Sequence, residues 1–197
     1  NTLAEAMTIY RLAKESNVPC FTSSALRMAP GTVAVRTDPA VGGVRGCDAY
    51  SPASAMPFHP DQFYYGIHGI EALFGIMGPG CQSVSRVHAE NYDVVVGLWE
   101  GGRIGTFRGT REGAHGYGAT VFGKKGVATV GKFEGYEPLL IQIVRFFKTG
   151  KAPVTPEESL EVIAFMEAAN ESLQKGGCPV TIESVMEKAR KEAAGRK

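Results

Sequence analysis

Histidine is the first side chain to consider for chemistry in this sequence, because its reference pKa of about 6.5 suits proton transfer near neutral pH. Of the four histidines, His68 falls in the first half of a segment that predicts a helix from Pro60 to about Met77. The positive end of a helix favours a neutral, proton-accepting imidazole. His68 is therefore our candidate proton acceptor. The alternative is a core histidine whose ring bonds a backbone carbonyl.

Tyr64 lies four residues before His68 and shares its predicted helix face. A phenol with a reference pKa of about 10 can hydrogen-bond the imidazole, but it carries no negative charge near neutral pH. Tyr64 is either a hydroxyl group of the same site or a core tyrosine whose tip reaches a cleft.

Cationic side chains indicate two further candidate binding regions. Arg27 ends the SALR segment, where the chain leaves a short apolar run, and ligands of open α/β sheets gather at such strand ends. It either binds a substrate or cofactor oxygen or joins two domains by an ion pair. Arg108, Arg111, His115 and Tyr117 surround a predicted loop between strands, where they could hold an oxygen-rich substrate. Their alternative is a set of solvated loop side chains.

Two glycine-rich stretches do not fit nucleotide-binding motifs. Residues 118–125, GATVFGKK, end in lysine where a phosphate-binding loop needs Ser or Thr, and they lie between two predicted strands. Residues 78–80, GPG, follow a helix rather than a strand, so they are interpreted as a helix stop. His59 and His68 are nine residues apart, and no metal site is predicted.

The elements that must position these residues begin with a helix over 3–16, which has one apolar stripe. VPCFTS at 18–23 follows as a short apolar strand, and this order is typical of the last helix and strand of a parallel βαβ unit. Residues 30–57 are rich in Gly, Pro, Ala and Ser and predict a connection, in which GTVAVRT at 31–37 could form a strand.

Residues 82–133 predict four or five antiparallel strands, with turns at Gly101–Gly102 and Gly123–Gly126. Helices are then expected over 137–149, 156–175 and 183–193, the second opened by the capping box TPEE. The fold class predicted is α+β, a mostly antiparallel open sheet with helices on one face, preceded by a Rossmann-type helix and strand. Both faces of the sheet look partly apolar, which predicts a dimer formed sheet against sheet.

Composition excludes several classes of protein. The chain has 197 residues, 44% of them apolar and 21% charged, with a net charge of +1. It therefore lacks the basic excess of a nucleic-acid-binding protein. Four well-separated cysteines favour reduced thiols, and neither a spanning helix nor a signal pattern is evident. The default expectation is a cytoplasmic protein, although an export signal could precede Asn1.

The sequence resembles the glucose-fructose oxidoreductase, inositol dehydrogenase and MocA (Gfo/Idh/MocA) family over nearly its whole length. The stretches that carry the resemblance are LAEAMTIYRLAKESNVPCFTSSALR, YYGIHGIEALFGIMG, GRIGTFRGTREGAHGYGATVFGKKG and EPLLIQIVRFFKTGKAPVTPEESLEVIAFMEAANESLQKGGCPV. They are similar to the family's final Rossmann helix and strand, active-site helix, sheet and C-terminal helices.

The resemblance implies a two-domain enzyme that oxidises the CH–OH group of a sugar, cyclitol or related polyol with NAD or NADP. Residues 1–28 would be the remnant of the Rossmann domain, residues 29–185 the substrate and oligomerisation domain, and residues 186–197 a helical tail. The family's catalytic lysine and glycine-rich phosphate turn would precede Asn1, so no cofactor is expected to bind this chain alone. His68 matches the family's active-site histidine, whereas Tyr64 stands where many members have aspartate.

Three functional interpretations remain. The chain is either the substrate-side part of such an oxidoreductase, whose partners would be the missing Rossmann domain and further copies in a homodimer or tetramer, or a free-standing, non-catalytic binding and oligomerisation module. An α+β enzyme of another type that uses His68 is a third option. An unpaired apolar strand edge favours aggregation, so residues 3–24 favour a parent with a preceding domain.

Overall fold

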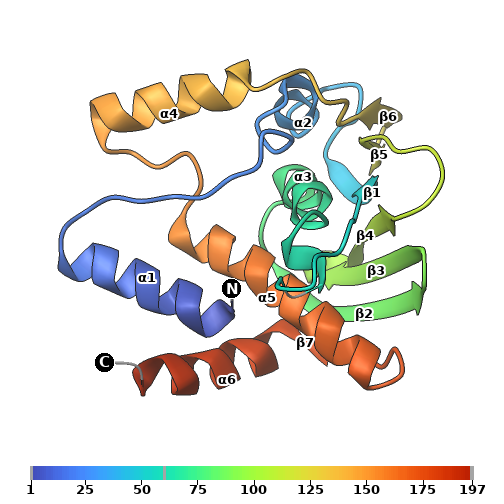
Figure 1. Ribbon diagram of the computed structural model, residues 1–197. Helices are drawn as coiled ribbons and strands as arrows, with labels where there is room; N and C mark the ends of the chain where they lie inside the picture. Colours follow the sequence, from blue (N-terminus) through green and yellow to red (C-terminus); the bar gives the residue numbers. More distant parts are fainter. Residues whose placement is uncertain (1, 60, 196–197) are drawn as a thin grey trace.

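A single seven-stranded sheet forms the centre of the computed structural model, which describes residues 2–59 and 61–195 (Figure 1). The strand order is β6-β5-β1-β4-β3-β2-β7. The β1–β4 pair is parallel and the other neighbours are antiparallel. The strands are β1 (Val44–Pro52), β2 (Cys81–Ala89), β3 (Tyr92–Trp99), β4 (Arg103–Thr110), β5 (Gly118–Gly123), β6 (Val127–Val130) and β7 (Val180–Thr181). This arrangement confirms the predicted α+β fold with a mostly antiparallel open sheet.

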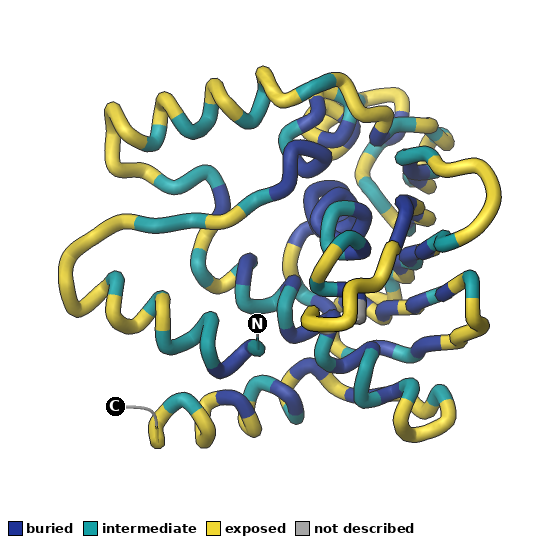
Figure 2. The backbone as a smooth tube through the Cα atoms, in the orientation of Figure 1, coloured by how far each residue is buried: buried dark blue, intermediate teal, exposed yellow. Residues whose placement is uncertain are grey.

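The helices that cover the sheet lie on one of its faces, as predicted. In Figure 1, α3 lies beside β1 and β4, and α5 packs against β2, with α1 and α6 packed beyond α5. The helices are α1 (Leu3–Glu15), α2 (Pro30–Ala34), α3 (Ile67–Met77), α4 (Glu137–Thr149), α5 (Pro156–Gln174) and α6 (Ile182–Ala194), with short 3-10 turns at Asp61–Phe63 and Glu100–Gly102. Figure 2 shows α3 almost entirely buried and α4 largely exposed.

Capping boxes begin two helices that pack against each other, α1 and α5. In α1, the Thr2 hydroxyl accepts from Glu5 N–H at 3.2 Å and the Glu5 carboxylate accepts from Thr2 N–H at 3.0 Å. Thr155 and Glu158 form the same box at the start of α5. Such reciprocal bonds satisfy backbone donors that the first helical turn leaves unpaired. The expected box at residue 155 and the helix over 156–175 are confirmed.

The core lies between the sheet and its helices. Trp99 of β3, Phe74 of α3 and Phe165 of α5 are fully buried, and their ring centroids lie 5.3–6.0 Å apart. Trp99 Nε1–H donates to the Gly78 carbonyl at 2.9 Å, which satisfies the polar atom of the indole. Gly69 brings α3 close to β1, because an added Cβ would come within 2.6 Å of Ser51 Oγ.

Three expected elements differ from the structure. The stretch 31–37 is not a strand, because Pro30 opens the helix α2 instead. Residues 44–52, expected to be part of a connection, form the central strand β1, whose buried positions carry small side chains with little apolar signal. The expected strand at 18–23 lies outside any helix or strand and does not join the sheet. The expected meander is also interrupted, because β1 separates β4 from β5.

On the other face of the sheet, the described residues form no covering helix. Leu98 of β3 is 42% exposed, Ile104 of β4 50% and Phe122 of β5 40%. The strands β3 and β4 are neighbours, and β1 lies between β4 and β5. This open face therefore carries apolar side chains, as the sequence indicated. Among the described residues no helix is long and apolar enough to cross a membrane.

Candidate functional site

A cavity of about 190 Å³ lies at the N-terminal end of α3. It brings together the segment after α1, the start of α3, the loop before β5 and the loop after β6. Its lining consists of Ser24, Ala25, Leu26, Tyr65, His68, Tyr117, Phe133 and Tyr136. Histidine, hydroxyl and aromatic groups thus meet at one place, where they could hold and deprotonate an alcohol.

His68 lies at the second position of α3, and its Nδ1 is 3.0 Å from Ser24 Oγ. Ser24 Oγ also accepts from Leu26 N–H at 3.2 Å. Burial lowers the pKa of His68 below its usual value of 6.5, which favours the neutral ring. When Nδ1–H donates to Ser24, Nε2 keeps the lone pair that a proton acceptor needs.

Two tyrosines form the opposite side of the cavity. The hydroxyls of Tyr65 and Tyr117 are 2.8 Å apart, and the Tyr65 ring stands edge-on to His68 with centroids 5.1 Å apart. Burial, together with the hydrogen bond and charge of Tyr65, raises the pKa of Tyr117 to about 12. The Tyr117 phenol therefore stays protonated near neutral pH. One hydroxyl of the pair donates to the other, which leaves one O–H that can donate to a substrate oxygen.

Tyr64 does not line this cavity. The helix begins at Ile67 rather than at Pro60, so Tyr64 precedes it and the expected helical pairing with His68 does not form. Tyr64 is 39% exposed, and its ring lies 5.6 Å from that of His59. Tyr65, its neighbour, supplies the phenol beside His68 instead.

Arg27 is buried in an ion-pair network rather than exposed to the cavity. Its guanidinium donates to Glu71 of α3 at 3.1 Å and to Glu158 of α5 at 2.9 Å. Burial raises the pKa of Glu71, and the adjacent Arg27 only partly opposes this effect. The structure therefore favours the ion-pair alternative for Arg27, which ties the segment after α1 to both helices.

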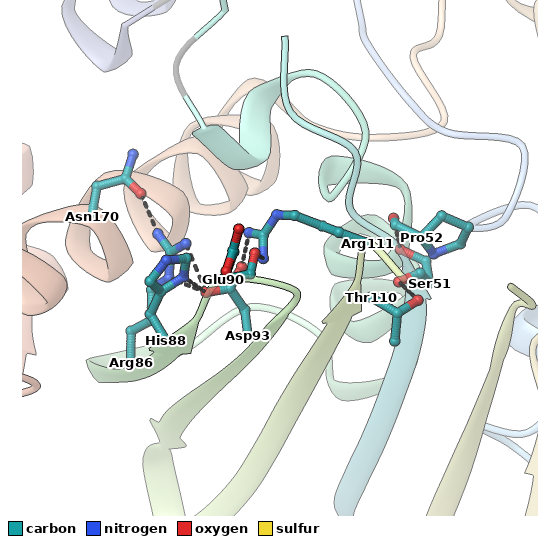
Figure 3. Close-up of polar contacts among 9 residues, drawn as sticks. All are labelled: Ser51, Pro52, Arg86, His88, Glu90, Asp93, Thr110, Arg111 and Asn170. Atoms are coloured by element: carbon teal, nitrogen blue, oxygen red, sulfur yellow. Dashed lines mark hydrogen bonds and ion pairs between the residues drawn. The ribbon is translucent and has the colours of Figure 1, made fainter. Parts of the chain in front are cut away.

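Arg111 takes part in a second network at the start of β3 (Figure 3). Asp93 Oδ1 accepts from Arg86 Nε at 2.8 Å and contacts His88 Nδ1 at 2.7 Å, while Oδ2 pairs with Arg111. Arg86 also donates to Asn170 of α5 at 2.8 Å. Burial would raise the pKa of Asp93, but the hydrogen bond from His88 and the charges and bonds of the arginines outweigh it and lower that pKa.

The remaining predicted residues are not brought to the cavity. Arg108 is exposed on the open face of β4, and His115 Nδ1 lies 3.5 Å from Thr110 Oγ1 in an exposed loop. Of the predicted site residues, the structure thus places His68 and Tyr117 together. The substrate-binding roles of Arg27, Arg108, Arg111 and His115 stay predictions without support from this geometry.

The polar and aromatic lining residues that were not recognised from the sequence are Ser24, Tyr65, Phe133 and Tyr136. The pair Tyr65 and His68 shows i, i+3 spacing, and this signal could have directed attention to Tyr65. Ser24, Phe133 and Tyr136 lie outside helices and strands, where no periodicity indicates which way a side chain points.

Gly78–Gly80 follows α3 and precedes β2, and residues 118–125 comprise β5 and its turn, so the expected helix stop and the expected turn between strands are confirmed. No group of three potential metal-ligating acidic, histidine or cysteine side chains occurs within residues 2–59 and 61–195. A cavity of 190 Å³ cannot enclose a dinucleotide, so these residues do not fit NAD on their own.

A larger groove of about 850 Å³ lies between α1, α5 and α6. Its lining is mainly apolar, and two of its cations, Arg11 and Arg190, already pair with Glu15 and Glu183. None of its lining residues also lines the His68 cavity. We therefore place the candidate site at the smaller cavity, where the titratable and hydroxyl groups converge.

No protein-family model matches the chain, and no curated protein matches its sequence significantly. Solved structures do match. A probable dehydrogenase from Thermotoga maritima superposes with a TM-score of 0.74 at 19% identity, covering 93% of this chain and 71% of that one. An oxidoreductase from Agrobacterium radiobacter in complex with NAD+, L-tartaric acid and magnesium gives 0.71 at 14% identity, with 93% and 71% covered.

A third similar structure is scyllo-inositol dehydrogenase from Lactobacillus casei with bound NAD(H) and scyllo-inositol, with a TM-score of 0.65 at 15% identity and 87% and 67% covered. The resemblance to Gfo/Idh/MocA-type dehydrogenases is thereby confirmed at the level of the fold. At these identities the similarity concerns the fold.

Proposed function

We propose that this chain is the substrate-side part of an NAD- or NADP-dependent oxidoreductase that acts on the CH–OH group of a sugar, cyclitol or related polyol. The observation that supports this most directly is the convergence of His68, Ser24 and the Tyr65–Tyr117 pair on one cavity. The fold shared with dehydrogenases is in keeping with it.

Different residues of the cavity bind the substrate and accept its hydroxyl proton. A phenol of the Tyr65–Tyr117 pair donates to the substrate oxygen and orients it. Nε2 of His68 accepts the hydroxyl proton, and Ser24 accepts the Nδ1–H bond that fixes the ring. A serine bears no charge, so it stabilises the imidazolium less than a carboxylate would. Burial keeps the pKa of His68 below 6.5, which favours release of the accepted proton.

The hydride acceptor implied by the family, NAD or NADP, would be held by a nucleotide-binding domain outside this chain. Exposed apolar side chains mark where such a domain could pack. Ile9 is 61% and Leu12 49% exposed on α1, while Val144 is 51% and Phe147 80% exposed on α4. No residue of α4 is buried, although its apolar side chains gather on one face.

The open face of the sheet supports a second expected partner, another copy of the chain. Leu98 of β3 pairs in register with Ile104 of β4, and Phe122 of β5 lies beyond β1 on the same face. A symmetric dimer would cover these side chains in both subunits. The four cysteines are free thiols, which supports a cytoplasmic setting for this assembly.

Hydride transfer tests the proposal. The nucleotide-binding part of the Thermotoga maritima dehydrogenase is fused ahead of this chain, and reduction of NAD or NADP by ring alcohols is followed by absorbance. We expect turnover, and a loss of roughly 100-fold or more in His68→Gln, because a general base contributes about that much. Phe58→Ala, at a side chain that is 92% exposed, is the matched control. Equal turnover by His68→Gln and the unmodified fusion would remove His68 from the mechanism.

A further inference from the structure

Aromatic rings form a continuous wall of the His68 cavity. The Tyr117 and Phe133 ring centroids lie 6.1 Å apart, and those of Phe133 and Tyr136 lie 5.3 Å apart with an edge-on geometry. Phe133 is 40% exposed and Tyr136 66% exposed, so these rings present apolar surface toward the mouth of the cavity. A ligand with a flat apolar face would remove this surface from water.

The hydrogen-bonding capacity of the cavity is small. Ser24 Oγ already accepts from Leu26 N–H and contacts His68 Nδ1. Tyr65 and Tyr117 bond each other, which uses one of their two O–H donors. The groups left for a ligand are one phenol donor of this pair, Nε2 of His68 and the Tyr136 hydroxyl.

The backbone of the cavity wall adds little to this capacity. The carbonyls of Ser24, Ala25 and Leu26 accept from the N–H groups three residues ahead, at 3.1–3.4 Å, so the turn over 24–29 is closed on itself. No Asp, Glu, Lys or Arg occurs among the described residues that line the cavity. A carboxylate or phosphate on the ligand would therefore lose its hydration without gaining a counter-charge.

We infer that the site selects an uncharged ring alcohol with one or two neighbouring hydroxyls and an otherwise apolar ring, in preference to a fully hydroxylated cyclitol or a charged sugar. This inference rests on the proposed function and narrows its substrate class. One hydroxyl meets His68 and the phenol pair, a second meets Tyr136, and the bare ring face packs on Phe133. Each further hydroxyl that the aromatic wall buries without a partner weakens binding roughly tenfold or more.

Binding of matched ring alcohols to the 197-residue chain tests the inference. trans-Cyclohexane-1,2-diol and myo-inositol share a six-carbon ring and differ in four hydroxyls, and glucuronate adds a negative charge. Affinities are measured by ligand-observed NMR, and the binding site is located from the aromatic signals of Tyr117 and Phe133. We expect the diol to bind roughly tenfold more tightly than myo-inositol or more, because one unpaired buried hydroxyl already has that effect.

Two phenylalanine variants test whether the aromatic wall of the cavity causes the preference for the diol. Phe133→Ala should weaken binding of the diol about tenfold and leave the weak binding of myo-inositol unchanged, whereas Phe58→Ala should alter neither. Circular dichroism confirms that both variants fold. If myo-inositol or glucuronate binds at these signals as tightly as the diol, the inference is overturned while the proposed function stands. If no ring alcohol shifts them, the inference is overturned, and the proposed function is then decided by the turnover of the fusion protein.

Discussion

The two faces of the sheet are built from the same strands but meet different surroundings. On the covered face Val95, Trp99 and Phe107 are fully buried under α3 and α5. On the open face Leu98 and Ile104 are about half exposed. Leu98 directly precedes the buried Trp99 in β3, and Ile104 lies on the neighbouring strand β4. Apolar side chains on the two faces therefore have different surroundings: those of the covered face form the core, and those of the open face stay accessible to the second copy of the chain that we propose.

The covered face also has buried charged side chains, whereas the charged side chains of the open face are exposed. Arg86 and Asp93 project from β2 and β3 into the interior beside α5, and both are fully buried. Asp48 of β1 points the other way and bonds Thr106 Oγ1 at 2.6 Å in an exposed position. Asp93 and Asp48 therefore allow the same type of side chain to be compared on the covered face and on the open face.

The largest effect on folding is expected from Trp99→Ala. Removal of a buried indole and its hydrogen bond to Gly78 should lower the free energy of unfolding by about 3–5 kcal/mol. Leu98→Ala changes the adjacent residue on the open face and should cost less than about 1 kcal/mol in the monomer. Denaturant unfolding of both variants measures the difference, and equal losses would show that the two faces are not distinct.

Asp93→Asn should have the next largest effect, about 3 kcal/mol, because it leaves the buried Arg86 and the adjacent Arg111 without their counter-charge. Asp48→Asn, the same change on the open face, should alter the free energy of unfolding by less than about 0.5 kcal/mol. The comparison is made by denaturant unfolding at neutral pH. A loss as large in Asp48→Asn would contradict it.

The pH dependence of the Asp93 contribution follows from its lowered pKa. A carboxyl whose folded pKa is below its ordinary value of 3.8 stabilises the fold above that value, and loses this contribution as the pH falls through the folded pKa. The gap in unfolding free energy between the unmodified chain and Asp93→Asn should therefore shrink as the pH falls below 3.8. Unfolding curves at a series of acidic pH values test this, and a gap that widens in acid would contradict the assigned network.

Ile104→Lys should have the smallest effect on folding and a large one on association. The side chain is 50% exposed, so the monomer should change by less than about 0.5 kcal/mol. In a symmetric dimer the substitution places an ammonium group from each subunit in the interface, and we expect the dissociation constant of the dimer to rise roughly 100-fold. Sedimentation measures the change. Phe58→Ala, away from the sheet, should leave association unchanged.

The sequence was most informative where local rules decide the structure. The capping residues Thr155 and Glu158 and the glycines that end the helices fix their own backbone geometry, and the C-terminal helices agree with the structure. β1 was missed because its inward side chains, among them Cys47 and Ala49, are small enough to admit α3. A strand defined by tight packing carries little apolar signal of its own.

The candidate site was predicted in part for a related reason. His68 could be recognised from its residue type and its place near a helix start, but the start itself was placed too early at Pro60. Since α3 begins at Ile67, Tyr65 rather than Tyr64 faces the cavity. The contacts of Ser24 and Arg27 with α3 join residues 44 positions apart, and no local pattern encodes such pairs.

The central position of β1 also sets the order in which the chain can assemble. β1 pairs with β4 about 60 residues later and with β5 later still, so neither neighbour exists when β1 leaves the ribosome. The helix α3 contains mostly local contacts and can form early, whereas closing the sheet waits for a long loop to come together. Synthesis to residue 123 is therefore the earliest point at which β1 has both of its neighbours, and we expect this step to govern the rate of folding.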